Sequence, residues 1–80
     1  MGLSVGFPDY FIPYARNGKH GLFIELKRKT GGYLSAAQQE WLDLLNDAGY
    51  VAIKCLGWED AARNITLYLE EQLQLDITND

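Results

Sequence analysis

A glutamate and a lysine stand two positions apart inside an apolar segment, in the run Phe23-Ile24-Glu25-Leu26-Lys27. Successive side chains of a β-strand point to opposite faces, so a strand here directs both charged groups off one face, about 6.6 Å apart along the backbone. Charged groups are rarely placed inside a core without a partner. The pair is therefore a candidate for chemistry that needs a carboxylate and an ammonium group together, above all around a metal ion.

Two further motifs lie on either side of this pair. Upstream, Gly6-Phe7-Pro8-Asp9 has the composition of a turn, and downstream, Ser35-Ala36-Ala37-Gln38 has the composition of a helix start. With these motifs in this order, the chain resembles the PD-(D/E)xK nucleases, and most closely the virus-type replication-repair nuclease (VRR-NUC) family, which is often found in phages. The resemblance is strongest over residues 6–69. The usual amino-terminal helix of the family is missing from this sequence.

The resemblance implies a metal-dependent endonuclease that uses Mg²⁺ or Mn²⁺ and acts on DNA. It implies that Asp9 and Glu25 are carboxylate ligands of the metal, with the backbone carbonyl of Leu26 as a further ligand. Lys27 is then expected to orient the attacking water and to stabilise negative charge, because a lysine beside two carboxylates stays protonated. In the resembling family, a glutamine at the place of Gln38 lies beside the active site and contacts water or phosphate.

Each of these residues also has a purely structural interpretation. Asp9, after a proline, is suited to fixing a turn, and Glu25 with Lys27 is suited to a solvated cross-strand ion pair. Gln38 is the third helical residue after Ser35, so its amide is equally suited to a capping box. The sequence leaves these alternatives open.

The charge is unevenly distributed along the chain. The formal net charge is −4, but residues 1–29 carry five basic and two acidic side chains, whereas residues 30–80 carry two basic and nine acidic ones. A basic face near the candidate site is thus compatible with an acidic total. We expect Arg16, Lys19, Arg28 and Lys29 to contact nucleic-acid phosphates, with plain surface positions as the alternative.

Length and composition indicate one small domain, residues 1–80. The chain is 48% hydrophobic, has no apolar run long enough to span a membrane, and has no basic-then-apolar signal peptide at its start. Its only cysteine, Cys55, allows no internal disulfide, so we expect a cytoplasmic protein. A domain of this size buries only about 60% of its unfolded surface, which favours a homodimer.

The spacing of apolar and turn residues predicts the elements in order. We expect strands over 9–12 and 22–27, joined by the turn at 16–21, then a helix capped by Ser35 and ended by Gly49, a strand over 50–56, and a helix starting at Gly57. The first helix is predicted to pack through Trp41, Leu44, Leu45 and Ala48, the second through Ala61, Ala62, Ile65, Tyr68 and Leu69. We expect the second helix to extend beyond Gln72, with Ile77 to Asp80 frayed.

These elements predict an α/β fold of order β-β-α-β-α, a mixed sheet flanked by helices, in which the first two strands are antiparallel and the strands around the first helix are parallel. By resemblance this is a restriction-endonuclease-like fold. A symmetric dimer would present two sites, which suits branched or Holliday-junction DNA. The alternative functions are a catalytically inactive remnant that binds nucleic acid or a replication partner, and a structural subunit completed by another chain.

Overall fold

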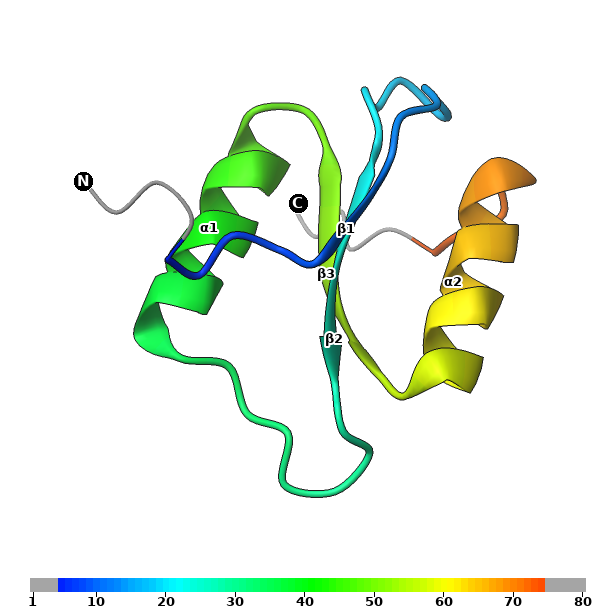
Figure 1. Cartoon of the computed structure of the whole chain (residues 1–80). Coiled ribbons are helices and arrows are strands. Elements are labelled where there is room, and N and C mark those ends of the chain that lie inside the picture. The colour runs from blue at the N-terminus through cyan, green and yellow to red at the C-terminus, as the bar shows by residue number, and fades with distance from the viewer. Residues whose placement is uncertain (1–4, 75–80) are drawn as a thin grey trace.

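The computed structural model of the chain describes residues 5–74, which form a three-stranded sheet between two helices (Figure 1). The elements follow the predicted order. They are β1 (Tyr10–Ile12), β2 (Leu22–Lys27), α1 (Ala36–Asp47), β3 (Val51–Leu56) and α2 (Trp58–Leu69). None of the helices within residues 5–74 is long and apolar enough to cross a membrane. The predicted fraying of Ile77 to Asp80 lies outside the described residues.

The sheet is mixed, as predicted. Its strand order is β1-β2-β3, with β1 antiparallel to β2 and β2 parallel to β3. In the antiparallel pair Tyr10 lies opposite Ile24, and in the parallel pair Glu25 lies opposite Lys54. The central strand β2 pairs with β1 over residues 22–24 only, whereas the segment that carries the acid-base pair, residues 25–27, pairs with β3.

The two faces of the sheet pack against different helices (Figure 1). On the α2 face of the sheet, the buried core is formed by Leu22, Ile24, Val51 and Cys55 of the strands with Ala61 and Tyr68 of α2. On the α1 face, it is formed by Phe23 and Ala52 of the strands with Leu42 and Leu45 of α1. Side-chain alternation along β2 therefore places Glu25 and Lys27 on the α1 face, together with Phe23. Any group that assists Glu25 from a neighbouring layer must come from α1.

Helix α1 begins at its predicted cap, because the Ser35 side chain accepts a hydrogen bond from the backbone of Gln38. Its buried residues are Leu42 and Leu45, whereas Leu44 is 57% exposed. The predicted inward positions of Leu44 and Ala48 were therefore wrong, because Ala48 is exposed as well. The buried stripe follows Gln38, Leu42 and Leu45, which are four and three residues apart, so Gln38 lies on the helix face that packs against the sheet.

Helix α2 begins after Gly57, whose φ of 86° suits glycine, and ends at Leu69. The chain turns away there, since Glu71 has a φ of 59°. The predicted continuation beyond Gln72 was wrong, because the backbone leaves the helical region before that residue. Ala61 and Tyr68 pack on the sheet as predicted, but Ala62 is exposed to solvent.

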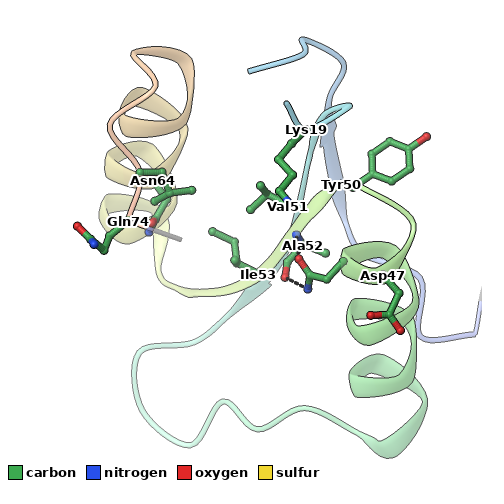
Figure 2. A pocket seen from close by; sticks show the side chains of 10 residues that line it. Lys19, Asp47, Tyr50, Val51, Ala52, Ile53, Asn64 and Gln74 are labelled. Carbon is green, nitrogen blue, oxygen red and sulfur yellow. Dashed lines mark hydrogen bonds between the residues drawn. The ribbon is translucent and has the colours of Figure 1, made fainter. Parts of the chain in front are cut away.

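Strand β3 has no neighbouring strand on its outer side within the described residues. The side chain of Asn46 takes part of that place. Its Nδ2 donates to the carbonyl of Ala52 at 2.9 Å and its Oδ1 accepts from the N–H of Ala52 at 3.0 Å. A hollow of about 520 Å³ runs along this edge, with Asp47 on the α1 side and Asn64 and Gln74 on the α2 side (Figure 2).

Candidate active site

Glu25 is the one buried charged residue of the described chain, with 3% of its surface exposed. Its Oε2 accepts a hydrogen bond from Nε2 of Gln38 at 3.1 Å and lies 3.7 Å from Nζ of Lys27. Its Oε1 is buried and has no hydrogen-bond partner. A buried carboxylate oxygen without a partner is costly, so this atom marks a position that is suited to a ligand.

Gln38 forms the capping box, one of the two alternatives that the sequence left open, and it also contacts Glu25. Its Oε1 accepts from the backbone N–H of Ser35 at 2.8 Å, and its own N–H donates to Oγ of Ser35 at 3.1 Å, which is a complete capping box. The same amide donates through Nε2 to Glu25. The capping box therefore fixes which end of the amide faces the sheet, and it orients a donor toward the buried carboxylate.

Asp9 is tied to β2 rather than only to its own turn. Its backbone N–H donates to the carbonyl of Ile24 at 3.0 Å, and its Oδ2 accepts from the N–H of Leu26 at 2.9 Å. Two bonds to residues on either side of Glu25 bring the two carboxylates together. The pKa of Glu25 is raised, first by burial and then by the negative charge of Asp9, while Lys27 acts in the opposite direction.

The glycine of the upstream turn is needed for this approach. Gly6 has a φ of 79°, and a Cβ at this position would lie 2.7 Å from the backbone carbonyl carbon of Ala37. A larger residue would push the turn away from the first turn of α1. Gly6 thus lets the turn that precedes Asp9 lie close to the helix end that supplies Gln38.

The donor set fits a hard divalent cation. Within residues 5–74 no group of three or more His, Cys, Asp or Glu side chains is suited to a metal ion. Mg²⁺ does not require one, because it is commonly held by one or two carboxylates with water and substrate phosphate completing its shell. Asp9 and the unpartnered Oε1 of Glu25 meet that requirement. A ligand role for the Leu26 carbonyl stays a prediction.

Two of the predicted phosphate-contacting residues lie at the same end of the sheet as Glu25. Arg28 and Lys29 directly follow β2 and are exposed, and Nζ of Lys29 lies 3.5 Å from Oε1 of Glu59. Lys54 was not among the residues predicted to contact phosphate. This exposed residue lies directly opposite Glu25 across the β2–β3 pair, and paired residues share a face of the sheet.

The other two predicted residues, Arg16 and Lys19, lie in the turn between β1 and β2, beyond the opposite end of β2. Arg16 donates from Nε to the carbonyl of Leu69 at 2.9 Å and from Nη1 to the carbonyl of Ala15 at 2.8 Å. The structure therefore does not bring these two side chains to Glu25. Arg16 joins the turn to the end of α2, and Lys19 borders the hollow beside β3 (Figure 2).

The acid pair, the lysine on the same strand and the sheet between two helices are features of a nuclease-type α/β domain. The model of the VRR-NUC domain family matches residues 1–59, and the chain belongs to this family. Among solved structures, it is similar to one described as a VRR_NUC domain protein, with 35% sequence identity and a TM-score of 0.83.

The similarity to that structure covers 89% of this chain and 59% of the other. The chain thus spans about three fifths of the length of the solved relative. No curated protein matches the sequence.

Proposed function

We propose that this domain hydrolyses DNA phosphodiester bonds as an endonuclease that depends on Mg²⁺ or Mn²⁺. One observation carries the proposal: Oε1 of Glu25 is buried without a hydrogen-bond partner, beside the carboxylate of Asp9 and the ammonium group of Lys27. Most buried acids that serve only the fold have a hydrogen-bond donor for each oxygen. Family membership supports nuclease chemistry in general.

Asp9 and Glu25 would hold the cation, which when bound polarises the phosphoryl oxygen and makes its water more acidic. The ammonium group of Lys27 would stabilise negative charge on the phosphate. Gln38 fixes the orientation of Glu25 by donating to Oε2, and this leaves Oε1 for the ligand. Because burial and the charge of Asp9 raise the pKa of Glu25, its carboxylate form becomes available at a higher pH than that of an ordinary glutamate.

DNA is favoured as the substrate by the cations around this end of the sheet. Lys27 and Lys54 share the face of Glu25, and Arg28 and Lys29 follow directly on the strand. Phosphate contacts of this kind strengthen binding regardless of sequence. A homodimer would present two such sites, and branched or Holliday-junction DNA is the substrate that we propose for that assembly.

A second candidate function is a catalytically inactive domain that binds nucleic acid or a replication partner. It is favoured by the small number of acidic ligands, because the described residues offer two carboxylates and no third. Under this alternative the lysine and arginine side chains contact phosphate, but no divalent metal ion binds between Asp9 and Glu25.

The experiment is a cleavage assay on linear and four-way-junction DNA with Mg²⁺, with Mn²⁺ and with a chelator, together with calorimetric titration of Mn²⁺. We expect cleavage with either metal and none with the chelator. Glu25→Gln should abolish both cleavage and Mn²⁺ binding. Asp60→Asn is the matched control, because Asp60 is an acidic residue of α2 that lies outside the site, and it should retain both.

DNA binding without Mn²⁺ binding by the unmodified protein would favour the inactive alternative. Cleavage by Glu25→Gln at the unmodified rate would remove the proposed site.

A further inference from the structure

An exposed aromatic pair lies on the opposite face of the sheet from Glu25. The rings of Tyr10 and Trp58 have centroids 5.3 Å apart and planes inclined by 54°, and the two residues are 44% and 58% exposed. Tyr10 lies opposite Ile24, a residue of the core beneath α2, and Trp58 is the first residue of α2. The pair therefore belongs to the α2 face.

The pair lies at the same end of the sheet as the candidate active site. Tyr10 directly follows Asp9, and Trp58 directly follows Gly57, whose N–H donates to the carbonyl of Lys27 at 2.8 Å. Each aromatic residue is thus one or two positions from a backbone group that bonds to the catalytic segment of β2. A chain molecule that passes over the end of β2 would meet the carboxylates on one face and the aromatic pair on the other.

The other exposed aromatic strand residue differs from this pair. Phe11 stacks on Phe23 with centroids 4.4 Å apart and planes inclined by only 17°, so one of its faces is already covered. Tyr10 and Trp58 are too inclined to cover each other's faces in this way. Exposed flat apolar rings without a stacked partner are suited to a planar ligand.

We propose that Tyr10 and Trp58 bind an unpaired nucleobase of the substrate, on the opposite face of the sheet from the phosphate held at Asp9 and Glu25. This inference rests on the proposed nuclease function and deepens it, because it assigns two residues to the recognition of unpaired nucleotides. Bases inside a duplex are stacked and paired, so their faces are not free for an aromatic platform. The domain should therefore prefer DNA with unpaired nucleotides beside the cleaved bond, including branch points and single-stranded flaps.

The first test uses Trp58 as its own reporter. The chain has two tryptophans, so Trp41→Phe leaves Trp58 as the only one. In a chelator, which prevents cleavage, we expect single-stranded oligothymidine to quench Trp58 fluorescence, and a blunt duplex of equal length to quench it far less. Fluorescence anisotropy of labelled DNA reports binding independently. Bound oligothymidine that leaves Trp58 fluorescence unchanged would overturn the inference.

The second test measures affinity in variants. Tyr10→Leu and Trp58→Leu keep apolar volume but lose the flat ring, and each should weaken oligothymidine binding about tenfold while changing duplex binding little. Trp58→Phe should restore most of the affinity. The matched control is Tyr14→Leu. Tyr14 is also 58% exposed, but it lies in the connection between β1 and β2, at the other end of the sheet from Tyr10 and Trp58. Equal affinity in all variants would contradict the proposal.

These outcomes separate the inference from the proposed function. Quenching of Trp58 by oligothymidine, without cleavage under any metal, would support the aromatic platform and contradict the nuclease. Metal-dependent cleavage with unchanged binding in Tyr10→Leu and Trp58→Leu would support the nuclease and overturn the platform.

Discussion

Two carboxylates of this domain, Glu25 and Asp60, each lie beside a basic side chain and a side-chain amide. Only Asp60 is complete, in the sense that both of its oxygens accept a hydrogen bond. Oδ1 of Asp60 accepts from Nη2 of Arg63 at 2.6 Å and from Nδ2 of Asn64 at 3.1 Å. Its Oδ2 accepts from the N–H of Leu56 at 2.8 Å. Both oxygens of Asp60 are therefore satisfied by the protein itself.

Glu25 has the same types of neighbour, Lys27 and Gln38, but they contact a single oxygen, and the other is left without a hydrogen bond in a buried position. The difference is the one that we expect between an acid that stabilises the fold and an acid that binds a ligand. A donor for each oxygen offsets the cost of burying a carboxylate, and Glu25 lacks one of these donors.

The largest expected effect is on chemistry at the incomplete carboxylate. Lys27→Met keeps the apolar stem but removes the charge beside Glu25, and we expect the cleavage rate to fall about 100- to 1000-fold with the fold unchanged. Initial rates at saturating DNA, with circular dichroism for folding, measure this. Arg63→Met removes the corresponding cation beside Asp60 and should cleave at the unmodified rate, so an equal loss in both variants would refute the comparison.

The next effect concerns stability at the complete carboxylate. Asp60→Ala leaves the N–H of Leu56 and the amide of Asn64 without their acceptor, and we expect it to destabilise the fold by about 2 kcal/mol. The melting temperature should fall by about 10 °C. Glu59→Ala, a change of an exposed acid in the same helical turn, should cost at most about 0.5 kcal/mol. A folded Asp60→Ala protein without activity would contradict a purely structural role.

A smaller effect separates the two roles of Gln38. Gln38→Glu keeps the capping box, because glutamate also suits the third helical position, but it places a second negative charge against Glu25. We expect helix stability to be retained and cleavage at neutral pH to fall about tenfold. The acid limb of the pH–rate profile should move to higher pH, since the new charge raises the pKa of Glu25 further. An unmoved acid limb would argue against contact between the two groups.

The smallest expected effect is that of Glu25→Gln on the stability of the metal-free protein. We expect this substitution to stabilise the fold, whereas Asp60→Ala should destabilise it. The pKa of Glu25 is raised on folding, so the folded protein binds more protons than the unfolded one and loses stability as the pH rises from about 4.5 through the raised value. Glu25→Gln removes this loss. We expect its melting temperature in a chelator at neutral pH to exceed that of the unmodified protein.

This advantage should shrink at lower pH, where Glu25 becomes protonated in both states. Differential scanning calorimetry from acidic to neutral pH tests it. A destabilised Glu25→Gln protein at every pH would show that Glu25 is needed by the fold.

The fold was largely readable from sequence because its signals are local. The bounds of β2 (Leu22–Lys27), the cap at Ser35 and the helix start after Gly57 follow from alternation, side-chain capping and backbone freedom. The inward face of α1 was partly wrong, because Leu42 and Leu44 are both apolar and only the packed sheet decides which is buried.

Contacts between residues far apart in the chain could not be predicted from the sequence. The guanidinium of Arg16 bonds to the carbonyl of Leu69, which is 53 residues away, and no local pattern predicts that pairing. Lys54 became part of the candidate site only through the register of β2 and β3. The hydrogen bond from Gln38 to Glu25 could be predicted only by knowing that α1 packs on the face of the sheet that carries Glu25. The spacing of Gln38, Leu42 and Leu45 does indicate, from sequence alone, that Gln38 faces the sheet.

The amide of Asn46 has a consequence for how this molecule meets others. An uncovered strand edge is a template for aggregation, since any extended peptide can add to it. By occupying both backbone groups of Ala52, Asn46 removes the first pairing position on the outer side of β3. One polar side chain thereby blocks one pairing position at this edge, without covering the strand.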